Sequence, residues 1–390
     1  MTSPMSFQTI VHIADSHFDE RHGLAENFEL HMLLGRHLRE LSPGLIVHSG
    51  DLYERKSSPA ERNCAIAVIG FLSEIAPVVL VRGNHDAHGD LHKFRAIGRN
   101  HPVLVFDEAT HYDISGFRVI ALPWFEKSGI VARMDPAERQ FAGTTATIGA
   151  ARGLLATLAT YASEGRARGL TPLLVGHVLV AGSEVSTGQT VIGQTVELDP
   201  ASILDVGCEY AALGHIHKAQ QWYDGRVRYA GSPQRLNFGE LEDKGASLVT
   251  FREGRFERAS FLQLPARKIV LVDCDVPGPR RVVVRGDARD HVNAFVRARI
   301  HVTAEDMRTL DEEAMRQTLF AGAKDVKFEY IVKVQQRVRC EAIATARSTW
   351  AKFLAYLAAA GIELTEPQLE RCRAKLSSIE EIVGSGRGDV

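Results

Sequence analysis

Five short apolar runs in the first part of the chain each lead into a small residue and then a side chain that can bind a metal ion. Short apolar runs bounded by turn residues are typical of buried strands. Ligand sites of open α/β sheets collect beyond the carboxyl ends of their strands. The clusters that follow the runs are Asp15-Ser16-His17, Gly50-Asp51, Gly83-Asn84-His85-Asp86, Gly176-His177 and Gly214-His215-Ile216-His217.

This pattern predicts that seven candidate ligands meet at one edge of the fold. They are Asp15, His17, Asp51, Asn84, His177, His215 and His217. A mixed shell of imidazoles, carboxylates and a carboxamide suits Mn²⁺, Fe²⁺ or Zn²⁺ better than Ca²⁺, which prefers oxygen ligands alone. Seven ligands are too many for one ion, so we expect two divalent ions with Asp51 as the bridge. Two metals about 3.5–4 Å apart can clamp a phosphate ester and activate the attacking water.

His85 lies between a candidate ligand and an acid, so we expect it beside the ions and not on them. There it could donate a proton to the leaving oxygen or stabilise the charge that builds there. Asp86 could accept a hydrogen bond from the other ring nitrogen of His85 and fix its tautomer. We therefore predict His85 and Asp86 as catalytic residues.

The first part of the chain alternates strands and helices, which indicates an α/β domain. The expected strands cover residues 7–14, 45–48, 77–81, 117–122, 172–175 and 210–213, and antiparallel strands are expected at 227–230 and 246–251. The expected helices cover residues 25–41, 60–75 and 146–161. We expect His12 and His48, inside strands, to be core residues and His31 and His37, in a helix, to lie on the surface.

After Pro265 the pattern changes to that of a small α+β domain. Strands are expected at 269–272, 281–284 and 326–332, and helices at 290–299 and 311–320. Two further helices follow, the first with Trp350, Phe353, Leu354 and Leu357 on one face. We predict a catalytic domain at 1–265, a capping domain at 266–340, a helical hairpin at 341–384 and a flexible tail at 385–390.

The composition limits which partners and which cellular compartment we expect for the protein. The 390 residues carry 46 Lys and Arg against 48 Asp and Glu, so any surface for nucleic acid must be local. The arginines at 280, 281, 285, 289, 297 and 299 could form one, or could be an ordinary solvated face. Five scattered cysteines without a C-x-x-C pair argue against disulfides and thiolate zinc, and favour the reducing cytoplasm. No apolar run reaches the ~18 residues of a membrane span, so no membrane association is expected.

The ordered series of strand-end clusters is similar to the signature of the calcineurin-like metallophosphoesterases. That resemblance implies a four-layer fold, in which a two-sheet β-sandwich is flanked by helices. It assigns one ion to Asp15, His17, Asp51 and His217, and the other to Asp51, Asn84, His177 and His215. It also makes His85 the catalytic histidine.

Within that superfamily the chain resembles the SbcD-type DNA double-strand-break repair nucleases. The similar features are His12-x-x-Asp15-x-His17, Gly50-Asp51-Leu52-Tyr53, Tyr229-Ala230-Gly231-Ser232-Pro233 with Phe238-x-Glu240, and the small domain after residue 265. Phe18-Asp19 and Glu54 depart from the family pattern, which concerns the shape of the loop that faces DNA.

This second resemblance implies a nuclease subunit for DNA repair and recombination. It would hydrolyse DNA phosphodiester bonds, as an exonuclease and endonuclease, with a water activated by two metals; Mn²⁺ is the expected ion, with Fe²⁺ or Zn²⁺ as alternatives. The capping domain would contact DNA, and Arg235, Ser232 and His88 are candidate substrate contacts. By resemblance, the terminal hairpin would bind an SMC-like ATPase of the SbcC type, and the helices at 25–41 and 60–75 would help to form a homodimer; both segments could equally be ordinary core.

Four alternatives fit part of the pattern. A phosphodiesterase for small molecules such as cyclic nucleotides would use the same metal core, but would leave the chain after residue 265 unexplained. A protein serine/threonine phosphatase is disfavoured, since Glu54 and Asp86 depart from the motifs of that group. A non-catalytic scaffold that binds DNA ends is the remaining alternative, and a metal-free, degenerate phosphoesterase is disfavoured because every ligand position is filled.

Overall fold

The computed structural model describes residues 7–125, 144–189, 196–285, 288–333 and 341–385. The chain forms two compact units. The first comprises residues 1–272, 284–298 and 312–329, and the second comprises 273–283, 299–311 and 330–390. The predicted tail, apart from its first residue, lies outside the described residues, as does Cys340.

A six-stranded sheet contains the strands that lead to the first three clusters. Its order is β14-β13-β1-β2-β3-β4. The strands are β1 (Phe7–Ile13), β2 (Leu45–His48), β3 (Val78–Val81), β4 (Val103–Phe106), β13 (Lys244–Arg252) and β14 (Arg255–Leu264). The strands β1 to β4 are parallel, with Ile13 opposite His48. Their carboxyl ends therefore meet at one edge, where the clusters begin.

A second six-stranded sheet supplies the two later clusters. Its order is β11-β12-β10-β7-β6-β5. The strands are β5 (Thr110–Ile114), β6 (Phe117–Leu122), β7 (Thr171–His177), β10 (Tyr210–Gly214), β11 (Gln220–Trp222) and β12 (Val227–Tyr229). The segments expected as antiparallel strands at 227–230 and 246–251 form β12 and β13, and each has an antiparallel neighbour: β11 for β12, and β1 and β14 for β13. On its other side β12 runs parallel to β10.

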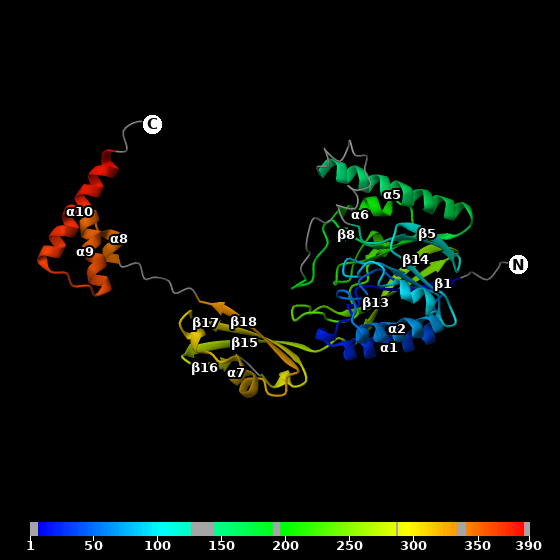
Figure 1. Ribbon diagram of the computed structural model, residues 1–390, viewed down its shortest axis with the longest axis horizontal. Coiled ribbons are helices and arrows are strands. Elements are labelled where there is room, and N and C mark those ends of the chain that lie inside the picture. The colour runs from blue at the N-terminus through cyan, green and yellow to red at the C-terminus, as the bar shows by residue number, and fades with distance from the viewer. Residues whose placement is uncertain (1–6, 126–143, 190–195, 286–287, 334–340, 386–390) are drawn as a thin grey trace. The chain divides into compact units, whose positions relative to one another are not determined.

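Apolar side chains fill three layers of core. Between the sheets lie fully buried residues such as Val47 and Val175. The helices α1 (Leu24–Leu41) and α2 (Pro59–Ile75) cover the outer face of the first sheet. The outer face of the second sheet is covered by α5 (Thr144–Ala167) and α6 (Pro200–Leu204). The predicted four-layer fold is confirmed (Figure 1).

The helices begin and end where the sequence supplies caps. The Ser58 side chain accepts from the Glu61 backbone N–H, and the Glu61 carboxylate accepts from the Ser58 N–H, which together form a capping box at the start of α2.

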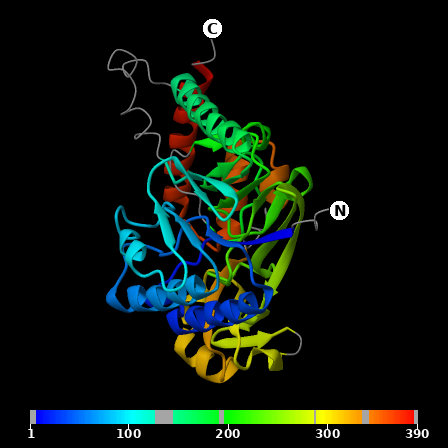
Figure 2. The same ribbon diagram turned by 90° about the vertical axis from the view of Figure 1, so that its right-hand side faces the viewer.

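Helices α1 and α2 run side by side in both views (Figures 1 and 2). Shorter elements are β8 (Leu179–Val180), β9 (Glu197–Leu198) and the 3₁₀ turns η1 (Glu20–His22), η2 (His92–Ala96), η3 (Tyr223–Gly225), η4 (Ala288–His291) and η5 (Asp306–Thr309).

Among the helical histidines, His37 is exposed as expected, but the prediction for His31 is wrong. His31 lies on the buried face of α1, and its side chain is held by Ser16, whose Oγ is 2.9 Å from His31 Nε2 and 2.8 Å from His48 Nε2. Burial lowers the pKa of His31 to about 4 and that of His48 to about 3. His12 and His48 are core residues, as predicted. The apolar pattern of α1 could not reveal a polar contact to a loop distant in sequence.

The chain after Pro265 forms a four-stranded sheet of order β16-β15-β17-β18. The elements are β15 (Ile269–Gly278), β16 (Arg281–Val284), β17 (Phe295–Val302), α7 (Glu312–Leu319) and β18 (Asp325–Val332). The helix predicted at 290–299 is wrong, because β17 occupies the second half of that segment. Val296, Ala298, Ile300 and Val302 are buried and alternate with partly exposed residues. This two-residue period is that of a strand.

Three helices complete the described chain: α8 (Glu341–Thr345), α9 (Thr349–Ala360) and α10 (Glu366–Ser385). Ser348 caps α9 through the Ala351 N–H, and Gly361 ends it in the left-handed conformation. The Arg373 guanidinium of α10 lies 5.6 Å from the centre of the Trp350 ring, which ties the two helices together. Leu354 and Tyr356 of α9 are exposed. Within the described residues, no helix is long and apolar enough to span a membrane.

Candidate metal centre

The predicted ligands sit in strand-end loops whose backbone is strained. Asp15, His17, Asp51 and His215 all have positive φ, between 44° and 111°. Such conformations are costly for residues other than glycine and persist where surrounding contacts hold them. Two of those contacts are backbone hydrogen bonds, from Asp15 N to Gly50 O at 3.0 Å and from His17 N to Asp51 O at 3.1 Å.

Two glycines of the sequence motifs make the approach of the ligands possible. A Cβ at Gly83 would lie 2.1 Å from Asp51 Oδ1, and a Cβ at Gly50 would lie 2.2 Å from His177 Nδ1. Any side chain at these positions would displace a candidate ligand. The small residue in the Gly-Asn-His-Asp and Gly-Asp clusters is therefore a steric requirement of the site.

The candidate ligands gather into two groups. The ligand atoms of Asp15, His17 and His217 lie within 4.8 Å of one another. The same holds for Asp51, His177 and His215.

Asn84 joins the second group, and Asp51 connects the two groups. Asn84 Oδ1 lies 2.9 Å from His177 Nε2 and 2.9 Å from His215 Nδ1. Asp51 Oδ2 lies 3.3 Å from His177 Nε2 and 3.7 Å from His17 Nε2, so one carboxylate oxygen faces both groups. The seven side chains predicted to converge do so.

The electrostatics of this cluster favour a bound cation. Although burial opposes a charged ring, the Glu54 and Asp51 carboxylates raise the pKa of His17 to about 9. Asp51 and Asp15 likewise raise the pKa of His177 to about 9 against the effect of burial. The neighbouring imidazolium groups in turn lower the pKa of Asp51, although burial opposes this. Without metal, the buried carboxylates are thus balanced by protons on two imidazoles.

Two buried ring nitrogens fit that interpretation. Within the described residues, His17 Nε2 and His215 Nε2 have no hydrogen-bond partner. Burial first, and then the positive charge of His177, lower the pKa of His215 to about 3, so its ring is neutral and can act as a ligand. Buried polar atoms are almost always satisfied, so orphaned nitrogens beside carboxylates point to divalent cations. The residues present therefore fit a pair of metal ions.

Comparison with known proteins identifies the family. The sequence profile of the calcineurin-like phosphoesterases matches residues 8–219, more than half of the chain. The chain belongs to the calcineurin-like phosphoesterase family. It is therefore a hydrolase that acts on phosphoester bonds, and its ligand clusters support two divalent metal ions.

Two curated relatives of this phosphoesterase are named as the SbcD component of the SbcCD nuclease. The protein from Rhodobacter capsulatus is 28% identical over 296 residues, which cover 66% of this chain and 72% of the relative. That from Staphylococcus epidermidis is 22% identical over 289 residues, covering 68% and 72%. A solved dimetal phosphatase from Danio rerio aligns with a TM-score of 0.38 at 13% identity, covering 66% of this chain and 99% of that one.

His85 lies beside the metal-binding groups of this phosphoesterase, at the mouth of the site. Its side chain is 37% exposed, and its ring packs edge-on to that of His17 at 5.1 Å between centroids. Its Nδ1 lies 2.8 Å from the backbone oxygen of Glu54, in place of the expected contact with Asp86. Because that oxygen can only accept, the proton of a neutral ring lies on Nδ1.

The Asp86 carboxylate binds two backbone N–H groups in place of the expected His85 ring nitrogen. Its carboxylate is buried and accepts from the backbone N–H of Tyr53 at 3.0 Å and of Gly83 at 2.9 Å. Burial and the charge of Asp51 raise the pKa of Asp86 to about 6. Asp86 therefore joins two of the metal-binding loops through their backbones, which adjacency in the sequence could not distinguish from a contact with the His85 ring.

Two glutamates outside the predicted ligand set support histidines in it. Glu54 Oε2 lies 2.6 Å from His17 Nδ1, and Glu240 Oε1 lies 3.0 Å from His217 Nδ1. The other oxygen of Glu240 is paired with Lys244 Nζ at 2.8 Å, and both side chains are fully buried. The sequence carried a signal for each: Phe238-x-Glu240 is a family motif, and Glu54 is a departure from one.

A cavity of about 370 Å³ opens onto the metal-binding groups. Asp19, Glu54, His85, Gln189 and Asn237 line it beside ligands from both groups. The three expected substrate contacts are not among its lining residues.

The structure places those three side chains elsewhere. Ser232 is buried and accepts from Lys244 Nζ at 2.9 Å. The Arg235 guanidinium donates to the backbone oxygens of Arg267 and Leu241. His88 is exposed and packs edge-on to His92. Ser232 and Arg235 thus support the loop that carries Asn237 and Glu240.

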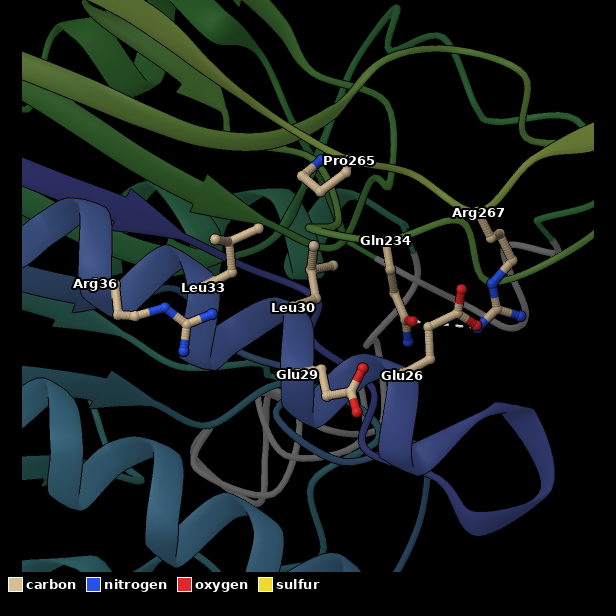
Figure 3. A pocket seen from close by; sticks show the side chains of 8 residues that line it. All are labelled: Glu26, Glu29, Leu30, Leu33, Arg36, Gln234, Pro265 and Arg267. Atoms are coloured by element: carbon tan, nitrogen blue, oxygen red, sulfur yellow. Dashed lines mark hydrogen bonds and ion pairs between the residues drawn. The ribbon is translucent and has the colours of Figure 1, made fainter.

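A second cavity, of about 280 Å³, lies against α1 (Figure 3). Leu30 and Leu33 point toward Pro265, and Arg267 Nη2 lies 3.2 Å from both Glu26 Oε2 and Gln234 Oε1. Its lining contains none of the seven candidate ligands. These contacts fix the start of the chain after Pro265 onto α1 and the 231–237 loop.

Proposed function

We propose that this phosphoesterase is a metal-dependent DNA nuclease subunit of the SbcD type. The observation that carries the proposal is the convergence of seven ligand side chains, with His85 at the mouth of the same cavity. Similarity to two proteins named as SbcCD nuclease components supports DNA as the substrate class. Manganese is the metal we propose, with Fe²⁺ and Zn²⁺ as alternatives, because the ligand set mixes nitrogen and oxygen.

In this proposal Asp15, His17, Asp51 and His217 hold one ion. Asp51, Asn84, His177 and His215 hold the other, and Asp51 bridges them. Bound divalent cations supply Lewis acidity, which activates water and offsets the charge of a phosphodiester. The protein orients these ligands through strained strand-end loops and through acceptors behind their rings, such as Ser49 O, 2.8 Å from His177 Nδ1.

His85 acts on the leaving oxygen. Its Nδ1–H is donated to Glu54 O, so Nε2 is the ring atom left to face the substrate. A protonated Nε2 can donate to the leaving alkoxide, and a positioned proton donor of this kind contributes about 100- to 10,000-fold in rate. Asp86 is a positioning residue that holds the loop of His85 from behind.

The partner proposals concern the rest of the chain. We propose that an SMC-like ATPase of the SbcC type binds the hairpin formed by α9 and α10, within the predicted segment 341–384. The exposed apolar side chains Leu354, Tyr356 and Ile379 on these helices support a protein partner. Residues 266–340 would contact DNA as a capping domain, and α1 and α2 would contribute to a homodimer. Cytoplasmic DNA repair and recombination is the proposed setting.

Purified protein with Mn²⁺, offered labelled duplex DNA beside bis-p-nitrophenyl phosphate, tests the function. A DNA nuclease cleaves the duplex, and His85→Ala loses cleavage while it keeps metal and DNA. Turnover of the small ester alone would favour a small-molecule phosphodiesterase. DNA binding without cleavage, unchanged in His85→Ala, would favour a non-catalytic scaffold.

A further inference from the structure

Glu54 lies in the loop after β2 and contacts both histidines on which the proposed chemistry depends. Its side chain is 33% exposed and lines the cavity over the metal-binding groups. It belongs to neither ion's proposed ligand set. Two separate polar groups of this one residue, the carboxylate and the backbone carbonyl, contact His17 and His85.

The carboxylate acts on His17. Glu54 Oε2 lies 2.6 Å from Nδ1 of that ring, the distance of a close ion pair. With Nδ1 engaged, Nε2 is the nitrogen left for a cation, and it is the one that faces Asp51 Oδ2 at 3.7 Å. A carboxylate behind a metal-binding imidazole fixes its tautomer and orientation.

The backbone carbonyl acts on His85 in the same way. Glu54 O lies 2.8 Å from His85 Nδ1, which directs the opposite nitrogen of that ring away from Glu54. The two rings pack edge to face at 5.1 Å between centroids. One residue thus contacts both an ion ligand and the proton donor, each through a different group.

We propose that Glu54 is a positioning residue that sets the tautomer and orientation of both His17 and His85, through its carboxylate and its carbonyl respectively. This inference rests on the proposed metal-dependent function and adds to it a residue outside the ligand set.

Glu54 offers a cleaner test than Glu240, which holds His217 in a comparable way. Glu240 is fully buried with Lys244, so its removal would break a fully buried ion pair and endanger the fold. Glu54 is partly exposed, and its contact with His85 is made mainly by the backbone oxygen, 2.8 Å from His85 Nδ1, whereas its carboxylate Oε1 lies 3.7 Å from that nitrogen. Substitution at 54 therefore removes one contact and spares the other.

The experiment compares Glu54→Ala and Glu54→Gln with wild type and with Glu40→Gln, an exposed glutamate of α1. Mn²⁺ binding is measured by isothermal titration calorimetry, and kcat for bis-p-nitrophenyl phosphate is measured at saturating Mn²⁺. Glu54→Ala should weaken one of the two ions by about 10- to 100-fold. Glu54→Gln should restore most of that affinity, because its amide oxygen can still accept from His17 Nδ1–H.

At saturating Mn²⁺, kcat of Glu54→Ala should return close to the wild-type value, since the carbonyl of residue 54 still holds His85. Wild-type affinity for both ions in Glu54→Ala would overturn the inference. So would a low kcat with both ions bound, because Glu54 would then act on the substrate directly. Wild-type protein that binds fewer than two ions would instead overturn the proposed function on which the inference rests.

Discussion

The two-sheet region and the chain after Pro265 use their polar side chains differently. In the two-sheet region, Asp15, His48 and His177 are buried, and their orientations are set by partners on other strands or loops. After Pro265, ion pairs such as Arg297 with Glu329 and Arg299 with Asp273 are partly exposed, and Leu354 and Tyr356 face solvent. The first region therefore holds its polar side chains in fixed orientations for a reaction, whereas the second exposes side chains that another molecule can contact.

The substitution Asp51→Asn is the most severe test of the role given to the two-sheet region. The amide keeps the oxygen that accepts from His85 N at 2.8 Å and tolerates the positive φ, but it removes the bridging charge. Activity on bis-p-nitrophenyl phosphate with Mn²⁺ should fall by at least about 1,000-fold, because several kcal/mol of charge stabilisation depend on the ions. Asp205→Asn, an exposed control on the same unit, should change nothing. Full activity and two retained ions in Asp51→Asn would refute the bridge.

His85→Gln should lower kcat by about 100- to 10,000-fold while the metal content stays at two ions. The ring lies beside the ligand groups and supplies a proton, so its loss affects turnover and spares binding. His37→Gln, on the exposed face of α1, is the matched control. Loss of metal from His85→Gln, measured by inductively coupled plasma mass spectrometry, would make His85 a ligand and contradict its proposed role.

Mn²⁺ affinity should rise with pH between 6.5 and 9. The pKa values of His17 and His177 lie near 9 without metal, against 6.5 in the unfolded chain, so a cation must displace their protons throughout that window. Affinity should increase about tenfold per pH unit for each proton displaced. Calorimetry in two buffers of different ionisation enthalpy measures the proton release. An affinity that does not change with pH would show that these rings bind no cation.

The metal-free two-sheet region should lose stability in acid. Burial lowers the pKa of His12 and His48 to about 3 and that of His31 to about 4, below the unfolded value of 6.5. Below pH 6.5 the unfolded chain therefore binds protons that the folded chain does not. The free energy of unfolding should fall by up to about 1.4 kcal/mol per pH unit for each histidine between pH 6.5 and 4. Urea titrations of wild type and His31→Gln at pH 7 and 5.5 measure this slope, which the variant should reduce.

The smallest expected effect concerns the surface after Pro265. Tyr356→Ser, at a half-exposed site on α9, should change the free energy of unfolding by no more than about 0.5 kcal/mol and leave Mn²⁺-dependent turnover as in wild type. It should weaken capture of an SbcC-type ATPase. Impaired turnover without the partner would mean that this surface supports the catalytic region, and the comparison would fail.

The sequence predicted those site residues that directly follow a strand. Each ligand follows a short apolar strand, and parallel strands bring their ends to one edge, so Asp15, Asp51 and His177 could be placed together from the sequence. The glycine at position 83 has a steric reason, because a Cβ there would lie 2.1 Å from Asp51 Oδ1. The alternation of strands and helices predicted an α/β domain, and the resemblance to the calcineurin-like metallophosphoesterases implied its four layers.

Other features depend on contacts that no local pattern contains. The His31 ring is buried beside Ser16, whose Oγ lies 2.9 Å from His31 Nε2, and Glu54 approaches His17 only after two loops have met. Tertiary partners decided these two cases. The strand β17 is different, because Val296, Ala298, Ile300 and Val302 alternate with Arg297, Arg299 and His301, and this two-residue period was present in the sequence.

The most direct test of the central claim is a crystal structure of the Mn²⁺-loaded protein with anomalous scattering data. The account predicts two anomalous peaks about 3.5–4 Å apart, with Asp51 between them. One peak should lie beside Asp15, His17 and His217, and the other beside Asn84, His177 and His215. A single peak, or two peaks that do not share Asp51, would contradict it.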